Sequence, residues 1–263
     1  MADFIRPLGQ TGLNISAIGL GTVKLGRDQG VKYPHAFTIP NDDETRDLFA
    51  LAKDLGINLI DTAPAYGNSE ERLGKLLPQR NDWVIVSKVG EEFENGVSYF
   101  DFSAQHTRRS VERSLRRLNT DYLDVVLVHS DGNDMDIVTQ QGTLDALSEL
   151  KKQGLIRAFG LSGKTVPGGI AALAQSDVAM VTENLSYHQE RPVIEYAHQH
   201  HKGVLIKKAF ASGHACSAGE DAVEKTLRSI FSLEGVSGII AGTINPKHLR
   251  ENVEKTRRVL SKV

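Results

Sequence analysis

Residues 123–161 read LDVVLVHSDGNDMDIVTQQGTLDALSELKKQGLIRAFGL and contain the pattern that decides the fold. An apolar run from Leu123 to His129 is followed by an amphipathic stretch from Val138 to Gln153 and by a second apolar run from Ile156 to Leu161. Strands that are apolar at nearly every position are expected when both of their faces are buried, as in a parallel sheet covered by helices. The stretch therefore predicts a strand–helix–strand unit.

The same alternation runs through the rest of the chain. Further strands are predicted at 17–22, 57–61, 83–88, 178–182, 204–207 and 238–241, and further helices at 41–55, 69–77, 104–118, 168–174, 192–201, 222–231 and 246–260. An open, doubly wound sheet would show the same rhythm, but eight units in about 250 residues favour a closed (β/α)8 TIM barrel. We expect residues 1–263 to form one such domain, with a β-hairpin over residues 4–15 before the barrel.

Composition restricts the partners and the compartment. The 263 residues are 40% hydrophobic and 24% charged, with a formal net charge of -2, so no nucleic acid or anionic membrane is expected as a partner. Cys216 is the only cysteine, which excludes an intramolecular disulfide. No apolar run approaches the roughly 20 residues of a membrane span, and the first residues lack a signal-peptide pattern. We expect a cytoplasmic protein, monomeric or a weak homo-oligomer.

Ionisable residues end three consecutive apolar runs. Asp61 ends the second predicted strand, Lys88 the third and His129 the fourth, and Tyr66 follows Asp61 in the next loop. The carboxyl ends of barrel strands carry the chemistry of such folds. A buried charge needs a partner, and Asp61 and Lys88 lie on neighbouring strands. Each residue alone could face solvent, but the four together indicate a catalytic site.

The four residue types fit one kind of chemistry. Lys88 is expected to lower the pKa of the Tyr66 phenol from about 10 toward neutrality, with Asp61 holding the ammonium in place. His129 could hydrogen-bond the carbonyl oxygen that Tyr66 protonates. A general acid of this kind, without a nucleophile–base pair, suits carbonyl reduction, in which a hydride reaches carbon and a proton reaches oxygen.

Three segments resemble the aldo-keto reductase family. They are GINLIDTAPAYGNSEERLG (56–74), VIVSKVG (84–90) and SVERSLRRLNTDYLDVVLVH (110–129). The resemblance implies a nicotinamide-dependent oxidoreductase with Asp61, Tyr66, Lys88 and His129 as its catalytic residues. The segment DFSAQ (101–105) is also similar to sugar dehydrogenases of the family such as L-galactose dehydrogenase, so a small carbonyl compound or a sugar is the expected substrate.

The resemblance also implies where a cofactor binds. The matching positions are Ser162, Gly163, Asn184, Lys207, Ala209, Phe210, Ser212, Gly213, Gly242, Thr243, Asn245, His248, Glu251 and Asn252. Lys207 stands where many members stack an aromatic ring on the nicotinamide, and Gly163 stands where many have asparagine. NADP(H) is the expected cofactor and NAD(H) the alternative. Val23, Lys24 and Phe93, in long loops, are candidate substrate contacts.

Other motifs fail. GLSGKT (160–165) would be a phosphate loop only with glycine at position 158, where the chain has Ala158, and residues 19–21 lack the third glycine of a dinucleotide fingerprint. Three histidines between 198 and 201 lie at a predicted helix end, where cations are favoured, so no metal site is expected. A non-catalytic, nicotinamide-binding regulatory subunit remains the alternative function, against which the four catalytic-type residues argue.

Overall fold

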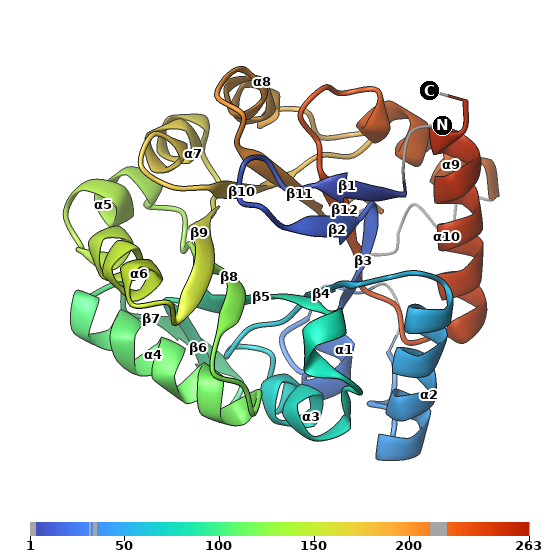
Figure 1. Cartoon of the computed structure of the whole chain (residues 1–263), viewed down its shortest axis with the longest axis horizontal. Helices are drawn as coiled ribbons and strands as arrows, with labels where there is room; N and C mark the ends of the chain where they lie inside the picture. The colour runs from blue at the N-terminus through green and yellow to red at the C-terminus, as the bar shows by residue number, and fades with distance from the viewer. Residues whose placement is uncertain (1–3, 32, 34–35, 211–219, 263) are drawn as a thin grey trace.

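A closed barrel forms the centre of the molecule (Figure 1). The computed structural model describes residues 4–31, 33, 36–210 and 220–262. Its barrel strands are β3 (Ile18–Gly21), β4 (Leu59–Asp61), β5 (Val84–Val89), β8 (Leu123–His129), β9 (Ile156–Ser162), β10 (Val178–Thr182), β11 (Gly203–Lys207) and β12 (Gly238–Ala241). Within this described part, all eight are parallel and follow the order β10-β11-β12-β3-β4-β5-β8-β9. The predicted TIM barrel is confirmed, and the open sheet is excluded.

Helices surround the barrel. They are α1 (Val23–Gly26), α2 (Asp42–Asp54), α3 (Ser69–Leu76), α4 (Ala104–Arg117), α5 (Asp134–Thr139), α6 (Thr143–Lys152), α7 (Val166–Leu173), α8 (Arg191–Gln199), α9 (Glu220–Phe231) and α10 (Pro246–Leu260), with a 3-10 turn η1 (Arg80–Asp82). The single helix predicted over 138–153 is wrong. Gly142 takes a positive φ of 76° at that point, so the chain forms the separate helices α5 and α6.

Side chains on the strands alternate between the inside and the outside of the barrel. The inward ones form a compact apolar cluster: Leu59, Val84, Val86, Val125, Leu127, Ala158, Val178, Met180 and Leu205. The outward ones pack against the helices in a second, larger cluster. Each fully buried aliphatic side chain contributes about 1.5–3 kcal/mol, so these two clusters supply the main stabilisation of the fold.

The predicted N-terminal hairpin is confirmed. Its strands β1 (Ile5–Pro7) and β2 (Asn14–Ser16) pair antiparallel and lie across one end of the barrel (Figure 1). Leu8 is fully buried there, and the amide of Gln10 donates to the carbonyl of His201 at 3.1 Å. Gly9 approaches β11 so closely that a Cβ on it would lie 2.4 Å from the backbone nitrogen of Gly203. The hairpin thus closes the end at which the strands begin.

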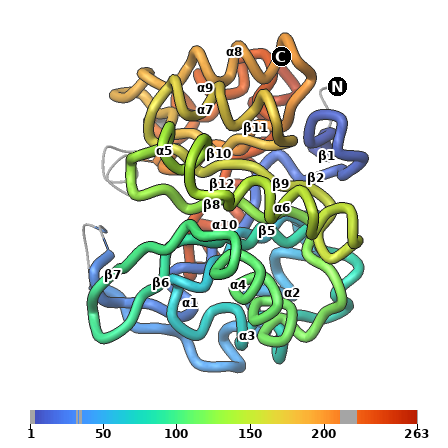
Figure 2. The backbone as a smooth tube through the Cα atoms, turned by 90° about the vertical axis from the view of Figure 1, so that its left-hand side faces the viewer, coloured from blue at the N-terminus to red at the C-terminus, as the bar shows by residue number. Residues whose placement is uncertain are grey.

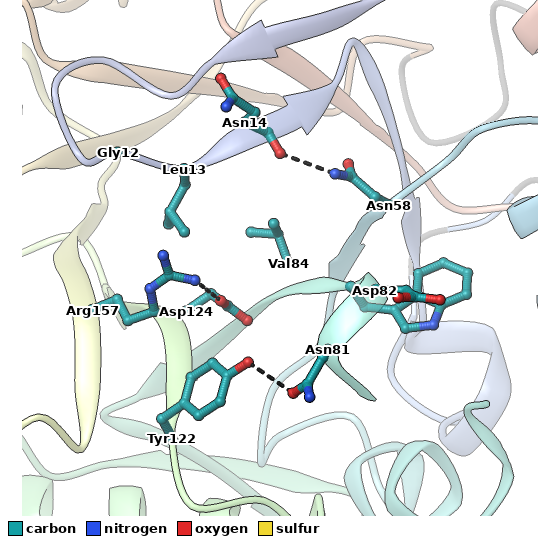
Figure 3. Close-up of a pocket in the computed structure, with 11 residues that line it drawn as sticks. Gly12, Leu13, Asn14, Asn58, Asn81, Asp82, Val84, Tyr122, Asp124 and Arg157 are labelled. Atoms are coloured by element: carbon teal, nitrogen blue, oxygen red, sulfur yellow. Dashed lines mark hydrogen bonds and ion pairs between the residues drawn. The ribbon is translucent and has the colours of Figure 1, made fainter. Parts of the chain in front are cut away.

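A cavity of about 200 Å³ lies at this same end (Figure 3). Its lining includes Asn58, Val84 and Asp124, at or near the first residues of their strands. The Asp124 carboxylate accepts hydrogen bonds from Arg80 at 2.8 Å and from Arg157 at 3.1 Å. These contacts tie neighbouring strand ends together and give the cavity a structural explanation.

A second hairpin follows β5 and was not predicted. Strands β6 (Glu91–Glu94) and β7 (Val97–Phe100) pair antiparallel across Asn95 and Gly96, both with positive φ. Asn-Gly is the preferred sequence for such a tight turn, so the sequence did contain the signal. Figure 2 shows β6–β7 and β1–β2 at opposite sides of the molecule. The second hairpin therefore belongs to the end at which the barrel strands finish.

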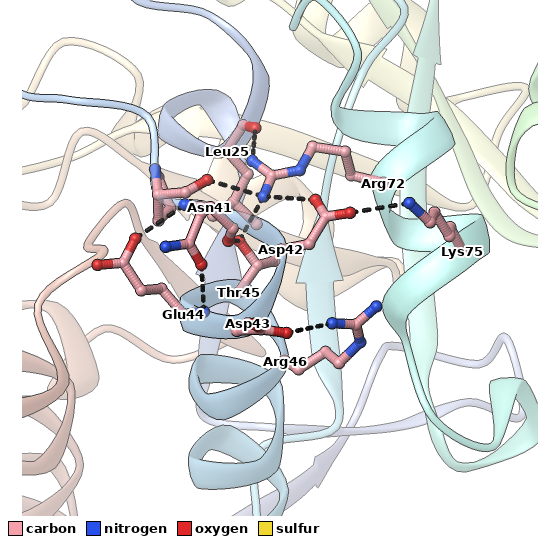
Figure 4. Close-up of polar contacts among 10 residues, drawn as sticks. Leu25, Asn41, Asp42, Asp43, Glu44, Thr45, Arg46, Arg72 and Lys75 are labelled. Atoms are coloured by element: carbon pink, nitrogen blue, oxygen red, sulfur yellow. Dashed lines mark hydrogen bonds and ion pairs between the residues drawn. The ribbon is translucent and has the colours of Figure 1, made fainter.

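Polar contacts fix the first helices (Figure 4). Asn41 Oδ1 accepts from the amide of Glu44 at 2.9 Å, and Glu44 Oε2 accepts from the amide of Asn41 at 2.8 Å, so the two residues form a capping box. Arg72 of α3 donates to the carbonyl of Leu25 at 2.6 Å and to the hydroxyl of Thr45 at 2.7 Å.

No helix in the described part of the chain is long and apolar enough to cross a membrane.

Candidate active site

The inside of the barrel changes from apolar to polar at the carboxyl ends of its strands. Since alternate residues face the interior, the inward positions that follow the apolar cluster include a polar residue in several strands. These residues are Asp61 of β4, Lys88 of β5, His129 of β8, Ser162 of β9 and Lys207 of β11. The strand pattern alone therefore gathers five polar side chains at one mouth.

Lys88 and Asp61 form a buried ion pair, as predicted. The Lys88 ammonium lies 2.5 Å from Asp61 Oδ1 and donates to the carbonyl of Thr62 at 2.8 Å. The two side chains are 2% and 6% exposed. Removing one member would leave a buried charge without its partner, at a cost of about 3–5 kcal/mol.

Tyr66 lies beside this pair. The Lys88 ammonium is 4.8 Å from the centroid of the Tyr66 ring, and the His129 ring meets the Tyr66 ring edge-on with 6.2 Å between centroids. The structure thus brings all four predicted residues together. Burial, with the negative charges of Asp61 and Glu91, raises the pKa of Tyr66 well above its usual value. The expected lowering of this pKa is wrong, because burial, the largest effect, and the charges of the two carboxylates raise the pKa despite the nearby Lys88 ammonium.

Glu91 is a member of this cluster that the sequence analysis missed. Its Oε2 lies 2.7 Å from Nδ1 of His129, and its Oε1 accepts a hydrogen bond from Ser98 at 2.7 Å. Although burial opposes it, the hydrogen bond and charge of His129 lower the pKa of Glu91 to about 2. Burial lowers the pKa of His129, and Glu91 partly offsets that effect. Glu91 stands only two residues after the end of β5, in the first strand of the hairpin that was not predicted.

Lys207 lies across the mouth from Lys88 and contacts neutral groups. Its ammonium donates to Ser162 Oγ at 2.9 Å and to the carbonyl of Gly163 at 2.7 Å. Burial lowers the pKa of Lys207 to about 8. Ser162 pairs in register with His129 on the neighbouring strand. Lys207, Ser162 and Gly163, three of the predicted cofactor positions, therefore contact one another at the mouth.

The remaining predicted cofactor positions fall into two groups. Asn184 is 8% exposed and donates to the carbonyl of Lys208 at 3.2 Å, while Ala209 and Phe210 are buried just after β11. Ser212 and Gly213 lie outside the described residues. The second group surrounds the start of α10: Gly242, Thr243, Asn245, His248, Glu251 and Asn252. There Asn245 caps the helix by accepting from the amide of Lys247 at 2.9 Å.

The three predicted substrate contacts lie at the rim. Val23 and Lys24 are half-buried in α1, and the Lys24 ammonium is 4.0 Å from the ring centroid of Tyr33. Phe93 of β6 packs against the guanidinium of Arg27, 3.4 Å from its ring centroid. Lys24 and Phe93 thus have packing partners within the protein, and any contact with substrate would be additional.

The mouth places Tyr66, a possible proton donor, beside a buried ion pair and a histidine ring, an arrangement suited to general acid–base chemistry. Residues 17–216 match the family model described as "Aldo/keto reductase family". The chain belongs to this family.

Individual relatives agree with this assignment. The chain is 37% identical to L-galactose dehydrogenase of Arabidopsis thaliana over 169 residues, 60% of this chain and 48% of that enzyme. It is 34% identical to an NADH-specific methylglyoxal reductase of Escherichia coli over 172 residues, 59% of this chain and 50% of that enzyme. The matches span about half the length of these two enzymes. A crystal structure described as an aldo-keto reductase of Pseudomonas aeruginosa is 58% identical, with a TM-score of 0.90, covering 98% of this chain and 96% of that one.

Proposed function

We propose that this protein transfers a hydride between a nicotinamide cofactor and the carbonyl carbon of an aldehyde, ketone or sugar, with Tyr66 as the general acid or base. The observation that carries the proposal is the position of Tyr66 between the buried Lys88–Asp61 pair and His129. We propose further that residues 1–263 act as one domain.

A dinucleotide fits the residues at the mouth and beyond it. Ser162 and Asn184 are buried polar side chains of the kind that hydrogen-bond a carboxamide. Gly242 leaves space beside the Tyr33 hydroxyl, which would lie 3.2 Å from a Cβ at that position. The start of α10 follows directly, and a helix N-terminus attracts phosphate groups. The bound cofactor would supply the hydride.

The protein's own residues would handle the proton. The raised pKa of Tyr66 keeps its phenol protonated at neutral pH, so it can donate that proton to a carbonyl oxygen that gains negative charge. The Lys88 ammonium, held by Asp61, stabilises the phenolate left behind. In the oxidative direction the same phenolate would accept the proton of an alcohol.

NADP(H) is the proposed cofactor, and NAD(H) is the alternative. Lys247 and Arg250 are exposed in the first turns of α10, where their charges could favour the additional phosphate of NADP(H). The Escherichia coli relative described above is named as NADH-specific, which keeps the alternative open. Fluorescence titration with NADPH and NADH should give the tighter binding with NADPH.

Substitution of Tyr66 tests the mechanism. Tyr66→Phe should bind NADPH as the wild type does but lose turnover by about 10²–10⁴-fold, the usual contribution of a general acid. The measurement is stopped-flow and steady-state oxidation of NADPH with a panel of aldehydes and sugars.

Tyr122→Phe is the matched control, because that hydroxyl contacts Asn81 beside the cavity at the opposite end of the barrel. It should leave turnover unchanged. Normal turnover by Tyr66→Phe would refute the assigned role. Wild-type protein that binds NADPH but reduces nothing in the panel would instead favour a regulatory subunit.

A further inference from the structure

Lys207 is the last residue of β11, and its half-buried side chain lies at the barrel mouth. Within the described part of the chain, its nitrogen donates to Ser162 Oγ at 2.9 Å and to the carbonyl of Gly163 at 2.7 Å. Both acceptors are neutral. Lys88, at the same mouth, is instead 2% exposed and paired with Asp61.

Two acceptors match the two N–H groups of a neutral amine. An ammonium group has three N–H donors, so the protonated form of Lys207 would keep one donor without a partner among the residues that the structure describes. The neutral form would satisfy both of its donors and retain a lone pair that the protein does not use. The contacts of Lys207 therefore suit a nucleophilic amine.

The carboxylates nearest in effect to Lys207 hydrogen-bond to other groups. Asp134 Oδ2 accepts from the amide of Thr165 at 2.7 Å, and Glu190 Oε2 accepts from the amide of Thr182 at 3.1 Å. Both carboxylates are buried and are held by these backbone contacts. They act on Lys207 through their charges only, without taking the place of its neutral acceptors.

The charge balance around Lys207 agrees with these contacts. Burial has the largest effect on the pKa of Lys207 and lowers it to about 8. The other charged or titratable groups that interact with it are Glu190, Asp134, Lys208, Lys88 and His129. The two carboxylates raise the pKa of Lys207, and the two lysines lower it. About a quarter of Lys207 is therefore neutral at a pH of about 7.5.

We propose that Lys207 is a site of covalent modification, at which an aldehyde that enters the barrel mouth is bound as an imine. The lone pair of the neutral amine attacks the carbonyl carbon and forms a C–N bond, and one proton passes from nitrogen to oxygen. The hydroxyl group and the remaining N–H proton then leave as water, so that a C=N bond replaces the C–O bond. Nothing is oxidised or reduced, and hydrolysis restores the lysine.

The test compares the rates at which single lysines are alkylated in cofactor-free protein by propanal and sodium cyanoborohydride, which reduces the imine to a stable secondary amine. Peptide mass spectrometry measures each site, and fragment spectra separate Lys207 from Lys208. At a pH of about 7.5, an amine of pKa 8 has a neutral fraction about 10²-fold larger than that of a lysine side chain in water. Lys207 should therefore react at least about 10-fold faster than Lys152, although Lys152 is exposed.

The ratio of these two rates should fall as the pH rises from 8 to 10.5, because Lys207 is by then already neutral. Lys88, buried beside Asp61, should stay unlabelled in the folded protein. Equal rates at Lys207 and Lys152 at a pH of about 7.5 would overturn the proposal, and so would a ratio that does not change with pH.

Lys207→Arg is the matched variant, because it keeps a positive charge but has no amine that forms an imine. The fast labelling should disappear, while the rate at Lys152 stays the same. Lys207→Met gives the same comparison without the charge, should arginine disturb the fold. Fast labelling that persists in both variants would place the reactive amine elsewhere and refute the assignment.

The labelling needs neither cofactor nor turnover. Its failure would leave the proposed hydride transfer standing, and failure of the Tyr66 test would leave the labelling result standing.

Discussion

Two lysines at the barrel mouth show how a single neighbour decides the state of a side chain. Lys88 has the Asp61 carboxylate beside it, whereas the hydrogen bonds of Lys207 within the described part of the chain go to a hydroxyl and a carbonyl. Neutral acceptors do not offset the cost of burying a charge, and burial lowers the pKa of Lys207 from 10.5 to about 8. The charge of Lys207 should therefore weaken the folded state at neutral pH.

Lys207→Met should remove this cost. Between pH 8 and 10.5 the unfolded chain keeps a proton on Lys207 that the folded protein has released, so stability gained from this group rises with pH in that window. As the pH rises from 8 to 10.5, the free energy of unfolding of the wild type should thus increase by about 1–2 kcal/mol relative to that of Lys207→Met. This figure allows for the partial exposure of the side chain. Urea unfolding of both proteins across this pH range measures the difference.

The positions of the four predicted catalytic residues at the barrel mouth could be predicted because they depend on the sequence pattern around each residue. Asp61, Lys88 and His129 end apolar runs, and strand alternation then points them inward. The pKa of Tyr66 could not be predicted in the same way. It depends on burial and on the charges of Asp61 and of Glu91, the first residue of a hairpin that was not predicted.

The elements differ in how clearly the sequence marks them. The helix α2 begins with a full capping box, and its start was predicted at Asn41. The break between α5 and α6 was missed, because a single Gly142 in an otherwise helical pattern does not show its φ. The hairpin β6–β7 was missed because its strands are only four residues long and β7 is mostly exposed, without the alternation of a half-buried strand.

The capping box of α2 should contribute measurably to stability. Asn41→Ala removes the acceptor for the amide of Glu44 and should lower the free energy of unfolding by about 1 kcal/mol. Asn68 holds the same position at the start of α3 but makes no capping hydrogen bond through its side chain. Asn68→Ala should therefore change stability by less than about 0.5 kcal/mol. Equal losses in the two variants, measured by denaturant unfolding, would contradict this account of the cap.

At the scale of the whole molecule, the barrel is closed at one end and carries the candidate active site at the other. The hairpin β1–β2 covers the end where the strands begin, and the polar cluster occupies the end where they finish. Eight strand–helix units were countable in the sequence, so the architecture was predictable. The docking of the first hairpin onto β11 was not, because nothing local to residues 4–15 encodes a partner so distant in the chain.

Alanine substitutions at two glycines of this hairpin distinguish the effect of its docking on the barrel from the effect of backbone strain. Gly9 and Gly12 have φ values of 54° and 76°, so alanine is strained at both. A Cβ at Gly9 would meet the backbone of β11, whereas one at Gly12 would meet nothing within 4 Å. Gly9→Ala should therefore lose at least about 2 kcal/mol more stability than Gly12→Ala in denaturant unfolding. Cofactor affinity of the folded fraction should be unchanged in both, and a similar loss of stability in the two variants would exclude this mode of docking.

The hydrogen bond from Gln10 to His201 joins two residues that the ribosome synthesises at different times. The two residues are 191 positions apart (201 − 10), so a ribosome working at about 5–20 residues per second makes the donor about 10–40 s before the acceptor. Throughout that interval Leu8 and its apolar neighbours in the hairpin lack the strand against which they finally pack. The nascent chain is therefore most exposed to aggregation during translation, and a chaperone that shields its first apolar segment should help this protein most at that stage.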